Sequence, residues 1–445
     1  MEYVVEMLNI RKEFPGIVAN DNITLRLKKG EVHALLGENG AGKSTLMSIL
    51  FGMYVPEQGI IKVRGKEVKI SNPNVANELG IGMVHQHFKL VHNFTVTQNI
   101  ILGSEPKKGL VVDVKSAAKK IEELSKKYGL NVDPYAKIED ISVGMQQRVE
   151  ILKMLYRDAE VLILDEPTAV LTPQEIDELM KIIKNLIVEG KSIIIITHKL
   201  KEIKAVADKC TVIRRGKYIG TVDVKETSEA KMAEMMVGRP VSFEVKKEDK
   251  KPGNVILKLE NVSVMNNKKV LGLKDFSLEV KSGEVLGIAG VEGNGQTELV
   301  EAITGMRSIA SGKIFFKNED ITNISIRKRI NSGIAHIPED RQKRGLVLDY
   351  TMENNMVLEI YNREPFSKRG LLNKKAIHEY AEKIINEFDV RSGQGGASIA
   401  RGLSGGNQQK AIIGREIELD PELLIAVQPT RGLDVGSIEY IHKRL

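Results

Sequence analysis

The feature that most constrains this chain is an internal repeat: one block of motifs occurs twice within 445 residues. Early in each copy the correspondence holds at an offset of 253, as from Gly37 to Gly290. Later it holds at an offset of 262, as from Pro167 to Pro429. The second copy therefore carries extra residues in its middle, where loops tolerate insertion. The chain must adopt a fold that can be built twice in tandem.

Within the first copy, apolar segments of strand length alternate with helical segments. The predicted strands are Val4–Ile10, Ile23–Leu27, Val32–Leu36, Val161–Leu164 and Ser192–Thr197. A helix is expected from about Gly42, a mostly helical stretch from Thr97 to Tyr156, and a further helix from Pro173, where Thr172 and Glu175 form a capping box. Continuous apolar strands between helices predict an α/β fold with a parallel sheet covered on both faces. We expect the second copy to repeat this arrangement.

A phosphate-binding loop follows the strand Val32–Leu36. Residues 37–44 read Gly-Glu-Asn-Gly-Ala-Gly-Lys-Ser, and a helix follows, which is the context that a P-loop requires. Backbone N–H groups of such a loop and the helix N-terminus attract phosphate oxygens. We expect Lys43 to reach the β- and γ-phosphates of a nucleotide and Ser44 to ligate Mg²⁺.

Two acidic residues follow the apolar strand Val161–Leu164. Ligands of such folds lie at the carboxyl edge of the sheet, where Asp165 and Glu166 would stand. We expect Asp165 to hold Mg²⁺ through water, and Glu166 to orient or deprotonate the attacking water.

Three further motifs carry a family resemblance. Residues 142–147 (Ser-Val-Gly-Met-Gln-Gln) and 403–409 (Leu-Ser-Gly-Gly-Asn-Gln-Gln) resemble the signature loops of ABC ATPases, His85-Gln86-His87 resembles their Q-loop, and Thr197-His198 their switch histidine. The resemblance implies two tandem P-loop NTPase domains. Each would have a mainly parallel core sheet, an antiparallel β subdomain and a helical subdomain. We place domain 1 at residues 1–238, a linker at 239–254 and domain 2 at 255–445.

The resemblance also implies an intramolecular, head-to-tail pairing of the two cassettes. Each ATP would lie between the P-loop of one copy and the signature loop of the other. Gln86 would complete the Mg²⁺ shell, His198 would contact the γ-phosphate, and Phe14 would stack on adenine, the alternative for Phe14 being a strand residue packed in the core. The expected contacts with ATP and Mg²⁺ are then Phe14, Gly37, Glu38, Asn39, Gly40, Ala41, Gly42, Lys43, Ser44, Thr45, Gln86, Asp165, Glu166, His198, Ser404, Gly405, Gly406 and Gln408.

The two copies have diverged in opposite senses. In the second, Gln296 replaces the P-loop lysine, Val427 and Gln428 replace the acidic pair, and Glu339 takes the Q-loop position. Gln cannot supply a positive charge. The signature loop of the second copy is near the family consensus, whereas Ser142-Val143-Gly144 in the first is not. We therefore predict one hydrolytic and one degenerate site.

The alignment predicts a shortened second copy, because Leu445 corresponds to position 183 of the first. The counterparts of the strand Ser192–Thr197 and of His198 are missing from the sequence. We expect a C-terminally truncated second domain, and one alternative function is therefore a non-catalytic scaffold.

Composition and charge limit the cellular compartment and the classes of partner that this chain can have. Cys210 is the only cysteine, which excludes an intrachain disulfide and indicates the cytosol. No apolar run reaches the roughly 20 residues of a membrane span. The net charge is +7, yet no dense Lys/Arg block with aromatic residues suggests nucleic-acid binding. A soluble twin-cassette ATPase acting on ribosomes or nucleic acid remains a second alternative.

Within ABC proteins, the chain most resembles the fused twin-cassette ATPases of ribose, galactose and nucleoside importers. The segments at residues 83–88, 100–106 and 337–341 favour the nucleoside branch. The resemblance implies two integral-membrane permease subunits and a solute-binding protein as partners, without nucleic acid. It places the protein peripherally at the cytoplasmic face of the cell membrane.

Overall fold

A computed structural model describes residues 3–15, 17–85, 88–109, 111–168, 171–241, 251–290 and 293–445. The chain forms two compact units, the first consisting mainly of Met1–Ser242 and the second of Phe243–Leu433 and Ser437–Leu445. Among the described residues, no helix combines the length and the apolar character that crossing a bilayer requires.

Unit 1 is built on a 10-stranded sheet in the order β5-β4-β1-β2-β12-β11-β3-β10-β9-β6. Five neighbouring strands from β11 to β6 run parallel, and β1, β2, β4 and β5 pair antiparallel. The strands are β1 (Tyr3–Phe14), β2 (Ile17–Lys28), β3 (Val32–Leu36), β4 (Gln58–Val63), β5 (Lys66–Val68), β6 (Ile81–Val84), β9 (Val161–Asp165), β10 (Ser192–Ile196), β11 (Lys209–Arg214) and β12 (Lys217–Asp223), with a separate hairpin of β7 (Lys107–Lys108) and β8 (Val111–Val112). The helices are α1 (Lys43–Leu50), α2 (Pro73–Glu78), α3 (Val96–Ile101), α4 (Val114–Tyr128), α5 (Val143–Tyr156), α6 (Pro173–Val188), α7 (Leu200–Val206) and α8 (Glu229–Val237).

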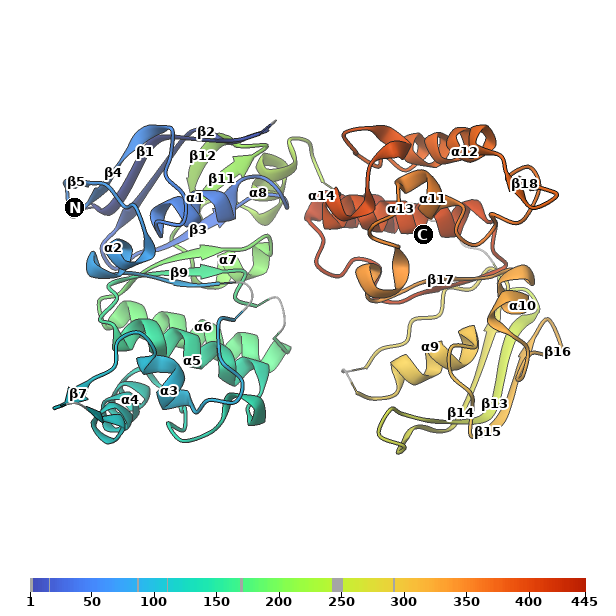
Figure 1. The fold of residues 1–445 in the computed structure, drawn as a ribbon, viewed down its shortest axis with the longest axis horizontal. Coiled ribbons are helices and arrows are strands. Elements are labelled where there is room, and N and C mark those ends of the chain that lie inside the picture. Colours follow the sequence, from blue (N-terminus) through green and yellow to red (C-terminus); the bar gives the residue numbers. More distant parts are fainter. Residues whose placement is uncertain are drawn as a thin grey trace. The chain divides into compact units, whose positions relative to one another are not determined.

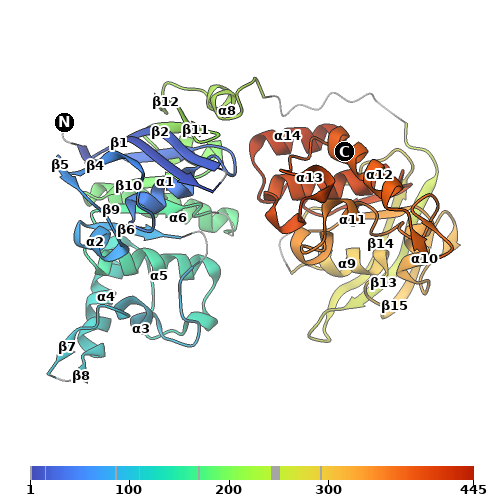
Figure 2. The ribbon, with the colours of Figure 1, turned by 45° about the horizontal axis from the view of Figure 1, so that its top comes forward.

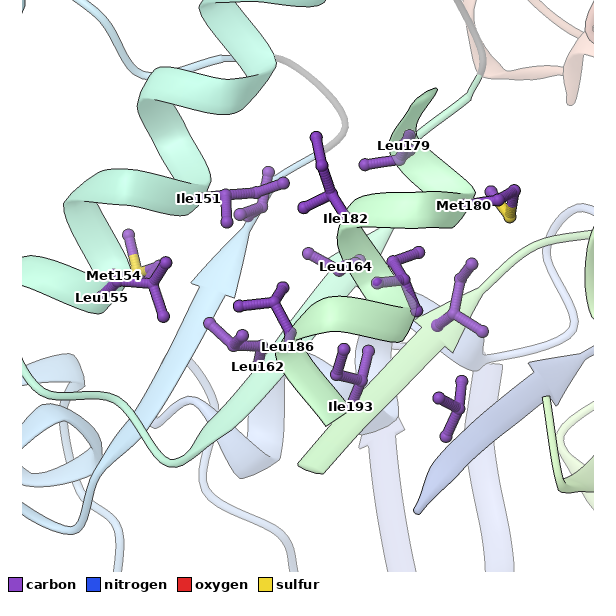
Figure 3. Packing of buried hydrophobic residues seen from close by; sticks show 14 of the residues in the cluster. Ile151, Met154, Leu155, Leu162, Leu164, Leu179, Met180, Ile182, Leu186 and Ile193 are labelled. Atoms are coloured by element: carbon purple, nitrogen blue, oxygen red, sulfur yellow. The ribbon is translucent and has the colours of Figure 1, made fainter. Parts of the chain in front are cut away.

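The parallel strands are buried on both faces, as their continuous apolar sequences predict. On one face, Leu162 and Leu164 of β9 and Ile193 of β10 pack against α5 and α6 (Figure 3). On the other, Ile163 and Ile194 join a cluster with α1. Successive side chains of a strand point to opposite faces, so each strand contributes to both cores. Figure 1 shows α1 and the pair α5–α6 on opposite sides of β9.

Local signals in the sequence set several element boundaries. Helix α6 begins at Pro173, and the capping box between Thr172 and Glu175 is complete in both directions. The P-loop strand and the acidic strand also lie where they were predicted. The α/β architecture with an antiparallel β subdomain and a helical subdomain is confirmed for unit 1.

Unit 2 repeats the antiparallel sheet and the helical part. The sheet order is β14-β13-β15-β16, and β17 pairs with β20 in parallel. Figure 2 shows α11, α12 and α14 gathered around α13, and residues of these helices share one apolar cluster. The strands are β13 (Val255–Met265), β14 (Leu271–Lys281), β15 (Ser311–Phe316), β16 (Glu319–Asp320), β17 (Ile334–Ile337), β18 (Ser367–Lys368), β19 (Leu371–Leu372) and β20 (Leu423–Ala426); the helices are α9 (Gln296–Thr304), α10 (Ile326–Asn331), α11 (Met352–Met356), α12 (Lys374–Glu387), α13 (Gly405–Glu418) and α14 (Val435–Arg444).

One expectation for unit 2 was wrong. The counterpart of β3, which begins at Val285, forms no strand, and Val285 is 85% exposed. The reason lies in how the strands of unit 1 pair, because β3 is hydrogen-bonded only to β10 and β11. Among its described residues, unit 2 has no strands equivalent to these two. An apolar sequence becomes a buried strand only where neighbouring strands satisfy its backbone groups.

Candidate functional site

The P-loop of unit 1 joins β3 to α1 along a path that needs glycine. Gly40 and Gly42 have φ values of 78° and 98°, in the left-handed region that glycine enters without strain. A Cβ on Gly42 would also lie 2.3 Å from the carbonyl oxygen of Ala19. Gly42 is the N-cap residue of α1 and leaves the first N–H groups of the helix without a side-chain cap. This arrangement suits an anion.

The predicted loop contacts occupy one short segment. Gly37, Glu38, Asn39, Gly40, Ala41 and Gly42 form the loop, and Lys43, Ser44 and Thr45 form the first turn of α1. The N–H of Ala41 donates to the carbonyl oxygen of Glu38 over 3.1 Å, which closes the loop into a turn.

Lys43 is buried at the base of this loop, with the residue only 5% exposed. Its Nζ donates to the carbonyl oxygens of Gly37 at 2.7 Å and Glu38 at 2.8 Å. Burial lowers the pKa of Lys43, and the carboxylates of Glu166 and Asp165 oppose that effect. Its ammonium group is therefore held by weak acceptors that phosphate oxygens could replace.

Ser44 and Asp165 bring two oxygen ligands together. Ser44 Oγ lies 3.5 Å from Asp165 Oδ1, although the residues are far apart in sequence. Burial raises the pKa of Asp165 to about 6, against the hydrogen bond from Ser44. A hydroxyl and a carboxylate are a donor set that suits Mg²⁺. The third predicted ligand, Gln86, lies outside the described residues.

Glu166 and His198 form a second pair beside the loop. Glu166 follows β9 and His198 follows β10, and their Oε1 and Nδ1 atoms are 3.2 Å apart. Burial works to raise the pKa of Glu166, but the hydrogen bond and charge interaction with His198, followed by the charge of Lys43, lower it overall. Glu166 therefore remains a carboxylate near neutral pH, as a base or water-orienting group must.

The backbone at Glu166 is strained. Its φ is 45°, a value that few residues other than glycine adopt and that functional sites concentrate. Its N–H donates to the carbonyl oxygen of Ile196 at 2.9 Å, which fixes the turn against β10. The structure thus brings Lys43, Ser44, Asp165, Glu166 and His198 together at the carboxyl ends of three adjacent parallel strands.

Phe14 ends β1 and is not part of the apolar clusters of unit 1. Its ring meets Tyr54 edge-on, with centroids 5.2 Å apart, and Lys12 Nζ lies 5.4 Å from its centroid. The residue is only partly buried. Phe14 is therefore not a residue of the two apolar clusters, and its stacking on adenine stays a prediction.

The counterpart positions in unit 2 keep the helix start and the turn after the acidic strand, but they lose the charged side chains. Gln296 begins α9 as Lys43 begins α1, and a Cβ on Gly290 would lie 2.1 Å from its Nε2, so its side chain lies over the loop. Gln428 has a φ of 44°, matching Glu166. Val427, in place of Asp165, offers no ligand.

At the Q-loop position of unit 2, Glu339 forms an ion pair with Arg431. The charge of this carboxylate is therefore balanced by a cation of unit 2 itself. Sequence comparison of the two copies found Glu339 but missed Arg431, because the pair joins residues remote in sequence.

The signature loops stand at the N-termini of equivalent helices. Ser404 is the N-cap of α13, and its Oγ accepts from Asn407 Nδ2 at 3.0 Å. Gly405 and Gly406 begin the helix. Gln408 is 1% exposed, and its amide donates to the carbonyl oxygen of Ala400 at 3.0 Å, which holds the loop in place. All four residues belong to unit 2.

Comparison with known proteins adds family evidence. The family described as ABC transporter matches residues 20–169 and 273–431. The chain is 59% identical over 445 residues to the guanosine import ATP-binding protein NupO of Bacillus subtilis, covering 100% of the chain and 87% of that protein. It is 57% identical over 444 residues to the nucleoside import ATP-binding protein NupA of Lactococcus lactis, with 100% and 88% covered. It is 44% identical over 473 residues to the glucose import ATP-binding protein TsgD13 of Haloferax volcanii, with 100% and 86% covered.

Proposed function

The chain belongs to the ABC transporter family as an ATP-binding, ATP-hydrolysing protein, and from this premise we propose that it energises nucleoside import through a single hydrolytic site. The observation that carries the proposal is the grouping of Lys43, Asp165, Glu166 and His198 in unit 1. The corresponding P-loop and acidic-strand positions of unit 2 carry Gln296, Val427 and Gln428 instead. The domain limits 1–238, 239–254 and 255–445 are part of the proposal.

The proposal gives each site residue of unit 1 a role in ATP hydrolysis. Lys43 neutralises charge on the β- and γ-phosphates, and the backbone N–H groups of residues 37–42 cradle them. Ser44 and Asp165 would hold Mg²⁺, with Gln86 as a further ligand, and the ion would neutralise the charge that develops on the phosphate oxygens. Glu166 orients the attacking water and accepts its proton, and His198 keeps Glu166 in place and contacts the γ-phosphate.

We propose further that the signature loop of unit 2 serves the ATP held by unit 1. Ser404 and the N–H groups of Gly405 and Gly406 would donate to the γ-phosphate, since these two glycines begin α13 and the Ser404 side chain caps the N–H of Asn407 instead. Gln408 fixes the loop from inside unit 2. ATP binding would then close the two cassettes, and hydrolysis would reopen them.

The cargo proposal rests on relatives. Two proteins whose names specify guanosine or nucleoside import are 59% and 57% identical to the chain, while the glucose import protein is 44% identical. Uptake of labelled guanosine and labelled ribose, in cells with and without the gene, tests the choice. Gene-dependent guanosine uptake is expected, and gene-dependent ribose uptake alone would refute a nucleoside cargo.

The proposed partners are two integral-membrane permease subunits and a solute-binding protein, with the chain at the cytoplasmic face of the membrane. The segment at residues 88–94 and the helical stretch after it would contact the permeases. Co-purification from detergent-solubilised membranes tests this. Recovery with ribosomes instead would favour the alternative of a ribosome-associated twin-cassette ATPase.

Substituting Phe14 with alanine should raise KM for ATP about tenfold and leave kcat nearly unchanged, because stacking on a base is worth about 1–3 kcal/mol and is made equally in ground and transition states. Steady-state phosphate release measures both constants. Tyr135→Ala, which removes a 68% exposed aromatic ring from the same unit, is the control. A fall in thermal stability without a change in KM would instead assign Phe14 to packing.

A further inference from the structure

One buried carboxylate of unit 1 belongs to none of the motifs. Glu202 lies in the first turn of α7 and is only 6% exposed. A carboxylate is rarely buried unless cations or hydrogen-bond donors surround it, because its desolvation is unfavourable. An acidic residue also favours a helix N-terminus, but it does so when exposed to water as well. The burial of Glu202 therefore depends on the groups that surround its carboxylate.

Both oxygens of this carboxylate accept a threonine hydroxyl. Thr168 Oγ1 donates to Oε1 of Glu202, and Thr197 Oγ1 donates to Oε2 at 3.0 Å. Each threonine is 2% exposed, so the protein itself supplies the partners of these hydroxyls. Glu202 thereby joins the segment that follows β9 to the segment that follows β10.

Lys199 completes this hydrogen-bond network. Its Nζ donates to Thr168 Oγ1, and its backbone N–H donates to Thr197 Oγ1, both at 3.0 Å. The same Nζ lies 3.2 Å from Oε1 of Glu202 and so balances the buried negative charge. Each hydroxyl thus donates to the carboxylate and accepts from Lys199. A polar network in which every member is satisfied holds its side chains in one arrangement.

The two threonines stand next to the residues proposed for hydrolysis. Thr168 follows Glu166 by two positions, and Thr197 directly precedes His198. The left-handed φ of Glu166, 45°, persists only where the surroundings enforce it. The N–H of Glu166 fixes one end of its turn to β10, and Thr168 fixes the other end to Glu202.

We propose that Glu202 is a positioning residue for ATP hydrolysis. It holds the two threonine segments so that Glu166 and His198 remain at hydrogen-bonding distance, 3.2 Å apart. A general base must lie within hydrogen-bond reach of the attacking water, and a displacement of about 1 Å can lower a rate about 10²-fold. Glu202 itself touches no reacting atom in this role. The inference rests on the roles proposed for Glu166 and His198.

Substitutions of Glu202 should lower kcat for Mg-ATP without weakening nucleotide binding. Glu202→Ala leaves both hydroxyls without their acceptor, and kcat should fall roughly 10- to 100-fold. Glu202→Gln keeps the shape of the side chain and one acceptor oxygen, so its loss should be smaller. The dissociation constant of Mg-ADP, measured by equilibrium titration, should change less than about twofold, because the network does not include the P-loop.

A cycle of substitutions with His198→Ala shows whether the effect passes through the catalytic pair. In single-turnover phosphate release, Glu202→Ala should change the rate much less once His198 is absent, because residues that act as a unit are not additive. A carboxylate that only stabilised the fold would give the same fold-change in both backgrounds. Thr197→Val, which keeps the side-chain shape and removes only the hydroxyl, tests the same contact if the alanine variant is unstable.

Glu234→Ala is the matched control, because it removes a glutamate of unit 1 that pairs with Lys231 at 3.1 Å near the surface. Its kcat should equal that of the unsubstituted protein. Unchanged kcat in the Glu202 variants and Thr197→Val, or equal fold-changes with and without His198, would overturn the inference. If Glu166→Gln and His198→Ala left hydrolysis intact, the proposed function would be wrong, whatever the Glu202 variants did.

Discussion

Replacing Lys43 with alanine should abolish ATP turnover, lowering it by at least 10²- to 10³-fold, while Gln296→Ala should change it less than about twofold. Lys43 is the buried cation of the P-loop in unit 1, next to Asp165 and Glu166. In the Lys43→Ala variant, no fixed, desolvated cation balances the negative charge that develops on the phosphates during hydrolysis. A contact of this kind lowers the activation free energy by about 3 kcal/mol or more. Phosphate release by the purified protein is the measurement.

Gln296→Ala is a matched control for this experiment, because both residues begin the helix that follows their P-loop. Gln296 carries no charge, so its loss removes one hydrogen-bonding group from a site that already lacks acidic ligands. A large loss of turnover in Gln296→Ala would contradict the single-site proposal. Equal unfolding midpoints for the two variants would exclude a general loss of structure.

The second large effect is expected from Glu166→Gln, which should lower turnover about 10²- to 10³-fold and leave ATP bound. The amide has the shape of the carboxylate, and its oxygen can still accept from Nδ1 of His198, now at 3.2 Å from Glu166. What disappears is the group that takes a proton from water, a contribution of about 10²- to 10⁴-fold. Rapid gel filtration after incubation with labelled Mg-ATP should recover the protein with ATP rather than ADP.

Glu160→Gln serves as the control for this variant. Glu160 lies just before β9 and pairs with Arg64 at the surface, where an ion pair contributes little. Its substitution should leave both turnover and the ratio of bound ATP to ADP unchanged. If Glu166→Gln hydrolysed ATP at a rate within threefold of the unsubstituted protein, the water-orienting role would belong to another residue.

The sequence predicted those parts of the fold that depend on local signals. The P-loop needs a strand, glycines and a helix in order, and Thr172 and Glu175 cap α6 as their spacing requires. The apolar strands of unit 1 are buried because their neighbours in the sheet are present. The same reasoning failed at Val285, since a strand depends on partners that a local pattern does not contain.

The contacts of the candidate site also fall into those that the sequence predicts and those that it does not. The adjacency of Ser44 and Asp165 could be predicted, because a P-loop and an acidic strand end at one sheet edge. The contact of Glu202 with Thr168 could not, because it joins segments that no motif relates.

The matching φ values of Glu166 and Gln428, 45° and 44°, bear on how far the second copy has diverged. A left-handed conformation at a residue other than glycine is unfavourable by about 1–3 kcal/mol and persists only where the surroundings enforce it. Unit 2 still enforces this left-handed conformation, although Gln428 has no carboxylate for the turn to orient. Unit 2 thus keeps the turn at Gln428, although the strand expected from Val285 is lost, and a carboxylate could be restored at residue 428 without redesign of that turn.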